Sequence, residues 1–402
     1  MFEIKYRDVA GRIGYLKVNN KKLETPLILP VINPNNLIIT PEEMRKYNIK
    51  AIMTNAYILY KKKFYGDIHE FLKFDGIIET DSGSYQMLHY KKDLEVTNKE
   101  IIEYQININS DIINVLDIPT DIDKSHEEAE KELYLTIERI KEGIDLKGNK
   151  LINGAVQGGI YLDLRRKAAE EVSRLNVDIF AMGTIVPYMI KYKFDKLFEN
   201  ILESRIILPL NKPVHLFGLG HTIILPLAVS IGADIFDSAS YVLFAKDLRI
   251  ITPFGTFRYE ESSNIFLETK KGMFHLEEIK DYSKEEKIKI IAENNLYQLI
   301  KEIELIKDAI KNQYLMDLVL IKAHSHYSVY KATKLVLEKY YNYLKMLDPV
   351  RKRSGIIYSG DLTEIRIDVK KAIERLKERV DPKDVEYIYD YVFPFNSYKN
   401  IK

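Results

Sequence analysis

Residues 76–85 read GIIETDSGSY and residues 233–241 read ADIFDSASY, so two apolar runs end in almost the same five residues. Each is a short β-rich run that stops on an acidic residue followed by small polar residues. This pattern predicts a strand that delivers a carboxylate to a site. Two carboxylates in one domain indicate acid/base or nucleophilic chemistry, because a pair can divide those roles.

The two segments belong to a sequence pattern that repeats from about residue 25 to residue 240. In each repeat an apolar run ends in Gly, Asn, Asp or Gln, and a charged amphipathic segment follows. Alternating strands and helices predict a parallel sheet, and eight such units predict closure into an α/β fold of the (β/α)8 or TIM-barrel type. The predicted strands are Leu27–Asn33, Ala51–Asn55, Gly76–Asp81, Ile112–Asp117, Gly154–Gln157, Ile179–Gly183, Val214–Gly218 and Ala233–Asp237.

A doubly wound open sheet is the alternative fold. The barrel is favoured because polar residues gather at the C-terminal ends of the runs, where barrel active sites assemble. These residues are Asn55, Asp81, Asp117, Gln157, Gly183, His221 and Asp237. Helices are expected between the strands, at Pro41–Tyr47, Lys99–Ile108, His126–Glu142, Leu162–Leu175 and Phe194–Ser204.

Outside the barrel, the first 24 residues predict a β-hairpin that covers the barrel floor, and Ser262–Phe274 reads as irregular. Ser283–Glu286 forms a capping box that opens a long helix to about Asn312. We expect one catalytic domain over residues 1–347, with a helical subdomain at 255–347, and a small C-terminal α/β extension over 348–402. The remaining expected elements are a strand or turn at Thr252–Arg258, helices at Tyr327–Met346 and Thr363–Arg379, and strands at Gly355–Ser359 and Glu386–Val392.

Composition excludes several classes of site. The 402 residues contain no cysteine, which rules out disulfides, thiolate nucleophiles and cysteine-rich zinc sites. The charges of the 60 basic and 59 acidic residues nearly cancel, so the net charge gives no indication of nucleic-acid binding. No apolar stretch reaches transmembrane length and no signal peptide is recognisable, which predicts a cytoplasmic protein. Abundant Lys, Glu and Ile lean towards a heat-adapted protein.

The strand-end residues suit a nitrogen heterocycle, because carboxylates accept from ring N–H groups while Gln both donates and accepts. A carboxylate can also attack an anomeric carbon while a second one acts as acid and base. Either Asp could instead cap the next helix, and Gln157-Gly158-Gly159 could be only a tight turn. Runs of basic residues occur at 61–63, 91–92, 165–167 and 351–353, and such runs are usually solvated surface. The first three follow predicted strand ends closely, so the alternative is that they surround the open end of the barrel and contact a phosphate backbone.

These motifs resemble the archaeal tRNA-guanine transglycosylase family. The resemblance implies a (β/α)8 barrel that replaces guanine 15 in the tRNA D-arm with 7-cyano-7-deazaguanine (preQ0), the first step towards archaeosine. The matching stretches are Glu79–Gln86, Leu116–Thr120, Val156–Gly159 with Asp163–Arg165, Met182–Pro187, His215–His221 and Phe236–Asp247.

By this resemblance, Asp237 is the nucleophile that links to ribose C1′, and Asp81 is the general acid/base that also contacts the heterocycle. A covalent intermediate retains configuration at C1′, and the target nucleotide must leave the tRNA stack. The residues that would bind the base are Ser82, Asp117, Gln157, Gly158, Gly183 and Thr184. The residues that would bind tRNA are Lys61, Lys62, Lys63, Arg165 and Arg166.

The chain departs from the family pattern in two ways. The family carries a zinc ion on three Cys and one His, whereas Ser262–Glu268 occupies the Cys-bearing stretch here and Asn294 stands at the expected place of the His. We therefore predict no zinc and no other cofactor, with Phe266, Phe274 and Leu276 packing against the long helix instead. The C-terminal RNA-binding PUA module of the family is also expected to be absent. A smaller difference is Thr184, where a smaller residue is expected in the base pocket.

The expected function is an active tRNA transglycosylase, forming a homo- or hetero-oligomer and assisted by a separate PUA-domain protein. The alternatives are a non-catalytic tRNA-binding scaffold paralogue and an exchange enzyme acting on DNA or with another 7-deazaguanine. A further alternative is a metabolic barrel enzyme acting on a small phosphorylated substrate. Retention of Asp81, Asp117, Gln157 and Asp237 argues against the scaffold. No clear phosphate-binding loop follows the last two strands, which argues against the metabolic enzyme.

Overall fold

A closed ring of eight parallel strands forms the centre of the protein in the computed structural model, which describes residues 2–85, 95–262, 264–349 and 357–379. The last strand pairs in parallel with the first, with Ile235 opposite Leu27. A parallel bridge between Val31 and Met53 joins the first strand to the second. An open doubly wound sheet would leave these edges apart, so the predicted barrel is confirmed. The strands are β4 (Leu27–Pro30), β5 (Ala51–Asn55), β6 (Ile77–Asp81), β7 (Ile112–Asn114), β8 (Leu151–Val156), β9 (Ile179–Met182), β10 (Val214–Leu216) and β11 (Ile235–Ser238).

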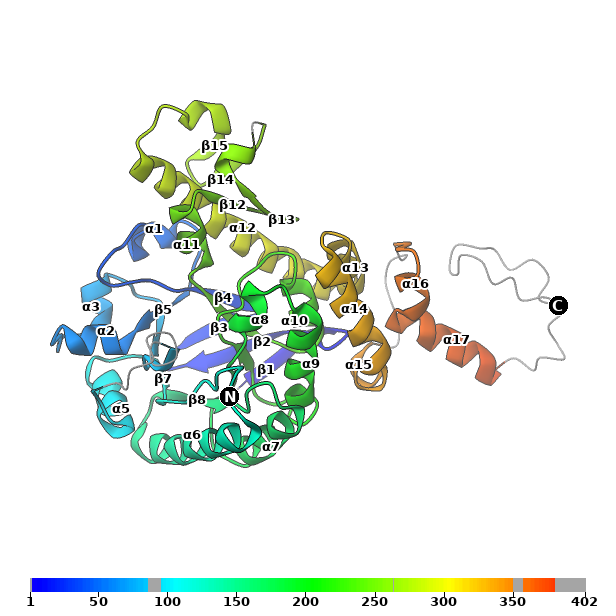
Figure 1. The fold of residues 1–402 in the computed structure, drawn as a ribbon, viewed down its shortest axis with the longest axis horizontal. Helices are drawn as coiled ribbons and strands as arrows, with labels where there is room; N and C mark the ends of the chain where they lie inside the picture. The colour runs from blue at the N-terminus through cyan, green and yellow to red at the C-terminus, as the bar shows by residue number, and fades with distance from the viewer. Residues whose placement is uncertain (1, 86–94, 263, 350–356, 380–402) are drawn as a thin grey trace.

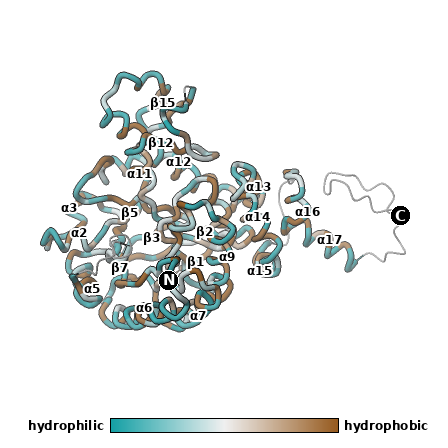
Figure 2. The backbone as a smooth tube through the Cα atoms, in the orientation of Figure 1, coloured by the Kyte–Doolittle hydropathy of each residue, from teal (hydrophilic) through white to brown (hydrophobic). Residues whose placement is uncertain are grey.

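Helices surround the strands on the outside of the barrel (Figure 1). Capping boxes begin three of them: Thr40 with Glu43, Thr97 with Glu100 and Ser125 with Glu128. In Figure 2 the outer helices α6 and α7 alternate between hydrophilic and hydrophobic colours, as amphipathic helices do. The helices of this layer are α1 (Pro41–Arg45), α2 (Ala56–Lys61), α3 (Ile68–Leu72), α5 (Asn98–Asn107), α6 (His126–Leu146), α7 (Leu162–Ser173), α8 (Val186–Ile190), α9 (Phe194–Arg205), α10 (Leu225–Ser230) and α11 (Ser240–Lys246).

The N-terminal segment closes the bottom of the barrel. It forms a three-stranded antiparallel sheet, β1 (Phe2–Asp8), β2 (Gly11–Val18) and β3 (Lys21–Thr25), which is one strand more than the predicted hairpin. Its buried apolar side chains form one cluster with the first residues of six barrel strands, so the expected covering of the floor is confirmed. The members of this cluster include Leu16, Val18, Leu23, Leu27, Ala51, Ile77, Ile112, Ile179 and Ile235. The opposite end, where the strands finish, is left for the site.

After the barrel the chain forms two short hairpins, β12 (Arg249–Thr252) with β13 (Gly255–Arg258) and β14 (Phe266–Thr269) with β15 (Gly272–His275). The expectation of an irregular stretch at 262–274 was therefore wrong. Few of its residues alternate between apolar and polar, so the strand signal was weak. The capping box of Ser283 with Glu286 does begin the long helix α12 (Lys284–Asn312), as predicted.

The helices that follow differ from prediction in two places. Helix α13 (Leu315–Ala323) was missed because its apolar residues surround the whole helix, which hides the usual amphipathic period. The single helix expected at 327–346 is two helices, α14 (Tyr327–Lys339) and α15 (Tyr341–Leu347). In the described part of the chain, no helix combines the length and the apolarity needed to span a membrane.

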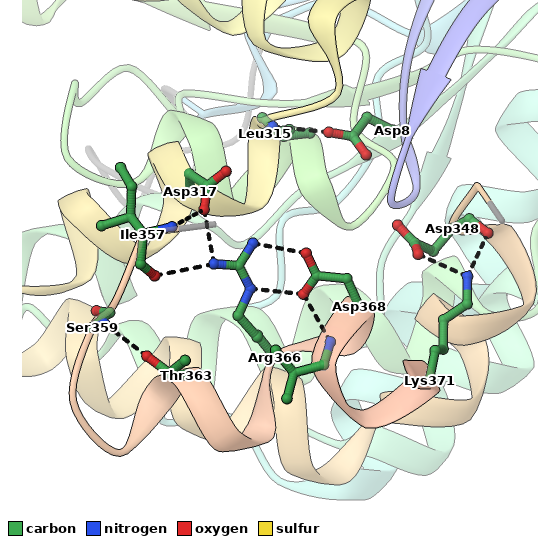
Figure 3. Close-up of polar contacts among 11 residues, drawn as sticks. Asp8, Leu315, Asp317, Asp348, Ile357, Ser359, Thr363, Arg366, Asp368 and Lys371 are labelled. Atoms are coloured by element: carbon green, nitrogen blue, oxygen red, sulfur yellow. Dashed lines mark hydrogen bonds and ion pairs between the residues drawn. The ribbon is translucent and has the colours of Figure 1, made fainter. Parts of the chain in front are cut away.

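The C-terminal segment packs against α13 through one buried arginine (Figure 3). Arg366 lies between α16 (Leu362–Ile365) and α17 (Ile367–Arg379), where it interrupts the expected helix. Its guanidinium donates to Asp317 at 2.7 Å and binds both carboxylate oxygens of Asp368 at 2.7 Å. Residues 357–359 are not a strand, and the strand expected at 386–392 lies outside the described residues. The domain division at residue 347 stays a prediction.

Candidate active site

The polar residues at the strand ends meet in the barrel mouth. Asp81 ends β6, Asp237 lies at the end of β11, Gln157 directly follows β8, and Asp117 lies three residues beyond the end of β7. Because parallel strands finish on the same side, the sequence places these side chains together. Asn55, at the end of β5, lies opposite Asp81 and donates to its Oδ2 at 2.7 Å. The carboxylates of Asp117 and Asp237 are both close enough to act on the charge of Asp81.

Asp81 is poised to exchange a proton near neutrality. Loss of hydration in the barrel mouth raises its pKa to about 7, and the negative charges of Asp117 and Asp237 act in the same direction. The backbone N–H of Gly83 and the amide of Asn55 oppose this rise, but they do not cancel it. A carboxyl group with a pKa near 7 suits a general acid and base at physiological pH.

A chain of hydrogen bonds lines the mouth beside Asp81. Gln157 donates from Nε2 to Asp117 Oδ2, and Thr184 donates its hydroxyl to Gln157 Oε1 at 3.1 Å. Burial raises the pKa of Asp117, while Ser84 and Gln157 work against that rise. A Cβ at Gly183 would lie 2.3 Å from Gln157 Nε2, so the glycine leaves room for the amide. These groups form one wall of donors and acceptors.

Thr184 is held in an uncommon backbone conformation. Its φ of 61° lies in the left-handed region, which β-branched residues rarely adopt. Such strain persists only where the surroundings impose it, and it gathers at functional sites. The hydroxyl that binds Gln157 thereby faces the same wall. The place of Thr184 in a base pocket stays a prediction.

Among the residues that the structure describes, Asp237 is anchored through one oxygen only. The backbone N–H of Gly218 donates to Oδ1 at 2.9 Å, and His215 Nε2 lies 3.0 Å from the same oxygen. The next helix, α11, has no side-chain cap, so the alternative in which Asp237 caps a helix was wrong. Beyond His215, the carboxylate of Glu79 lies 3.4 Å from Nδ1. Glu79 and His215 were not among the predicted site residues.

The glycine and serine residues of the motifs mainly shape the turns. Gly158 has a φ of 123°, and a Cβ there would lie 2.9 Å from the backbone of Leu164 and Arg165. The interpretation of this segment as a tight strand-to-helix turn therefore accounts for Gly158. Ser82 is buried, and its hydroxyl lies 2.9 Å from the hydroxyl of Ser84.

The basic residues do not form one rim. Arg165 is fully buried and donates to the carbonyls of Val156 at 3.0 Å and Gly183 at 3.3 Å. The prediction that Arg165 meets tRNA was wrong, because a buried guanidinium that holds two strand ends cannot reach a phosphate. Arg166 is half exposed but is paired with Glu203, and Lys61 pairs with Glu95 at 2.6 Å. Lys62 and Lys63 are exposed, and the runs at 91–92 and 351–353 lie outside the described residues.

Comparison with known proteins shows the family to which the chain belongs. The family model for queuine tRNA-ribosyltransferase matches residues 8–328. The tRNA-guanine(15) transglycosylase of Nanoarchaeum equitans is 50% identical over 401 residues, covering 99% of this chain and 95% of that protein. The chain belongs to the tRNA-guanine(15) transglycosylase family. It is thus a member of a family of pentosyltransferases. The relatives from Pyrococcus furiosus and Methanocaldococcus jannaschii are both 42% identical, and the aligned parts cover 68% and 59% of their lengths.

The zinc ion of this transglycosylase family does not fit the residues present here. The described residues contain no group of three or more His, Asp or Glu side chains able to hold a metal, and the sequence has no cysteine. Asn294, at the expected place of the His ligand, accepts from the backbone N–H of Glu268 at 3.0 Å and donates to the carbonyl of Ile251 at 3.1 Å. Its amide is thus committed to linking β14 and β12 to α12. That the protein binds no zinc stays a prediction.

The neighbouring Asn295 extends this link. It accepts from Ile251 N at 2.7 Å and donates to the carbonyls of Tyr241 and Arg249 at 3.3 and 3.0 Å. Of the apolar residues expected to pack here, Leu276 is buried and Phe274 packs partly buried against the main core, whereas Phe266 is 57% exposed and Leu267 is buried in its place. The one-residue shift follows from the period of two in β14, which sends neighbouring side chains to opposite faces.

Replacing Asn294 with Ala is expected to lower the free energy of unfolding by about 1–3 kcal/mol, because a buried N–H and a buried carbonyl lose their partner. Thermal unfolding of the variant measures the loss, with Asn264→Ala as the control, since Asn264 is exposed in the same subdomain. A chelator such as EDTA is expected to leave the unfolding of the unmodified protein unchanged. A chelator-sensitive transition would show that a metal, rather than the amides, holds the subdomain.

Proposed function

We propose that this protein exchanges guanine 15 in the D-arm of tRNA for 7-cyano-7-deazaguanine through a covalent Asp237–ribose intermediate, in the pathway to archaeosine. The observation that carries the proposal is the pairing in one barrel mouth of two carboxyl groups with different surroundings. Within the described part of the chain Asp237 is fixed through Oδ1 alone, and Asp81 has a pKa of about 7. Both the activity and the polymer agree with the name of the 50% identical relative, the tRNA-guanine(15) transglycosylase of Nanoarchaeum equitans.

The first displacement breaks the bond between guanine N9 and ribose C1′. Asp237 Oδ2 attacks C1′ and forms a C1′–O bond, and the electron pair of the C1′–N9 bond leaves on the base. Asp81, as the acid, gives its proton to the departing base, so that neutral guanine is released. Asp81 is then a carboxylate and Asp237 is an ester of the sugar.

The second displacement reverses these roles. Asp81 takes the N9 proton of 7-cyano-7-deazaguanine, whose N9 attacks C1′ as the C1′–O bond breaks and Asp237 recovers its negative charge. Two displacements at one carbon retain its configuration. The proton that leaves with guanine is replaced by the N9 proton of the incoming base, so both carboxyl groups return to their starting protonation states. No cofactor is needed for the sum of the two steps.

The donors and acceptors beside the carboxylates suit the edge of a guanine-like base. Asp117 offers carboxylate oxygens to ring N–H and amino groups, and Gln157 presents both amide functions. Ser82, Gly158, Gly183 and Thr184 are proposed to complete this pocket through their backbones and the Thr184 hydroxyl. The target nucleotide would turn out of the tRNA stack to enter it.

The tRNA backbone is proposed to approach over the exposed residues Lys62 and Lys63, with Lys61 and Arg166 available if their carboxylate partners give way. Phosphate contacts of this kind position the polymer and depend on salt concentration. An oligomeric assembly, assistance from a PUA-domain protein, a cytoplasmic location and heat adaptation remain predictions.

The test is the incorporation of labelled base into tRNA. Incubation of the protein with tRNA and labelled guanine or 7-cyano-7-deazaguanine is expected to give tRNA that carries label at position 15. Matched DNA and a tRNA with another base at that position are expected to stay unlabelled. Failure to label tRNA even with a PUA-domain protein present would contradict the proposal and favour a non-catalytic scaffold. Labelling of DNA would move the activity to another polymer.

A further inference from the structure

His215 lies at the centre of the barrel, where no solvent reaches it. Its Nε2 is 3.0 Å from Asp237 Oδ1, and its Nδ1 is 3.4 Å from Glu79 Oε1. The ring of Phe217 contacts the imidazole, with ring centroids 4.7 Å apart. The charged groups that act on His215 come from two other strands, Glu79 on β6 and Asp237 on β11. The imidazole therefore joins one buried carboxylate to the candidate nucleophile.

Glu79 needs a compensating charge inside the barrel. It is fully buried, and its Oε1 accepts from Asn114 Nδ2 at 3.0 Å and from Asn153 Nδ2 at 2.7 Å. These amides are neutral donors, which satisfy hydrogen bonds but do not balance a buried negative charge. Burial alone would lower the pKa of His215, yet the two carboxylates outweigh it and raise the pKa to about 9. A cationic imidazole is thus the state that suits both neighbours.

We propose that His215, held as a cation by Glu79, is the positioning residue of the nucleophile: together with the N–H of Gly218 it binds Asp237 Oδ1, so that Asp237 stays ionised and presents Oδ2 to the sugar. This inference rests on the proposed function, because it gives Asp237 the role of nucleophile. It adds His215 as the group that makes Asp237 the nucleophile and leaves Asp81 as the acid and base.

The different roles of Asp81 and Asp237 have an electrostatic origin. Asp81 and Asp237 share one poorly hydrated mouth, and like charges in such a place push one of the two pKa values upward. The charge of Asp237 does act on Asp81 in this direction. The cation lies against Asp237, so the proton resides on Asp81 and the nucleophile is left charged. Removal of the cation would allow the proton to settle on either carboxylate.

The charge of His215 can be measured without tRNA. Nitrogen-15 NMR of the histidine rings, with His215→Gln used to assign the resonance, is expected to show an imidazolium throughout the neutral range, titrating near pH 9. In Glu79→Gln the titration midpoint is expected to fall by roughly one to three pH units, the usual influence of a lost opposite charge. A neutral His215 ring at pH 7 in the unmodified protein would overturn the inference.

The coupling to chemistry is read from the pH dependence of adduct formation between protein and tRNA in a single turnover. In His215→Gln the acidic limb of the profile is expected to move up by roughly one to three pH units, because Asp237 loses its cation. At any pH on that limb the rate is expected to fall about tenfold for each pH unit by which the limb moves. His126→Gln is the matched control, since His126 pairs with Asp163 at the surface at 2.7 Å.

The outcomes separate the inference from the function on which it rests. An adduct profile of His215→Gln identical to that of the unmodified protein would overturn the positioning role while leaving the transglycosylase proposal intact. A fall in rate at all pH values, without movement of the acidic limb, would also overturn it, because that is the mark of a structural defect. Absence of any adduct in the unmodified protein would contradict the proposed function, and the NMR titration would still decide the charge of His215.

Discussion

Asp237→Asn is expected to abolish both base exchange and the covalent adduct with tRNA. The carboxamide keeps the shape of the side chain and can still accept hydrogen bonds from Gly218 and His215 through its carbonyl oxygen. The position of Oδ2, however, becomes a neutral amide nitrogen that cannot attack C1′. Removing a covalent nucleophile costs on the order of 10⁴-fold or more in rate, which places the variant below detection in most exchange assays.

The measurement is mass spectrometry of protein incubated with tRNA, which detects the protein–tRNA adduct directly. Asp247→Asn is the matched control, because Asp247 is an exposed carboxylate at the end of the helix that follows Asp237. The control is expected to form the adduct at the normal rate. If the adduct persists in Asp237→Asn, another residue is the nucleophile. The proposed roles of Asp237 as nucleophile and Asp81 as acid and base would then be wrong.

The strand ends were predictable because chain order and barrel geometry coincide there. An apolar run that finishes in a polar residue identifies both the strand and the direction of its last side chain. Asn55, Asp81 and Asp237 occupy the predicted strand ends, and they meet in the mouth as barrel closure requires. Only the order of the strands is needed to predict that these residues meet, and the eight regular repeats in the sequence give that order.

The residues within the strands were harder to recognise. Glu79 and His215 face the barrel interior from inside apolar runs, where a polar residue reads as a flaw in the pattern rather than as part of a site. The available signal was the period of two in a strand, which places Glu79 on the same face as Asp81. Nothing in the sequence alone shows that β6 and β10 bring Glu79 to within 3.4 Å of His215.

Arg165 shows how a local pattern can mislead. A run of three basic residues suggests a solvated surface, but the helical period places Arg165 beside Leu164 and Ala168 on the buried face of α7. Burial, with no ion pair to any residue that the structure describes, lowers the pKa of Arg165 to about 10, and the guanidinium donates to the carbonyls of Val156 and Gly183 at the ends of two strands. Its neighbour Arg166 points outward, as the run had suggested.

The rate of adduct formation is expected to depend on the protonation of Asp81. Asp81 has a pKa of about 7, so it carries its proton below that pH and loses it above. Departure of guanine consumes this proton in the proposed first displacement. Adduct formation by the unmodified protein is therefore expected to be level just below about pH 7, before the acidic limb of the profile begins, and to fall about tenfold per pH unit above about pH 7, as for a single essential acid.

Asp81→Asn should remove that limb, because the amide cannot give a proton to the leaving base at any pH. The rate of adduct formation is expected to fall by roughly 10²- to 10⁴-fold, the contribution of one general acid, and to be independent of pH across the neutral range. Asp75→Asn is the matched control, since the Asp75 side chain just before β6 is 82% exposed. If Asp81→Asn kept the normal limb near pH 7, another group would supply the proton, and the raised pKa of Asp81 would have no part in the chemistry.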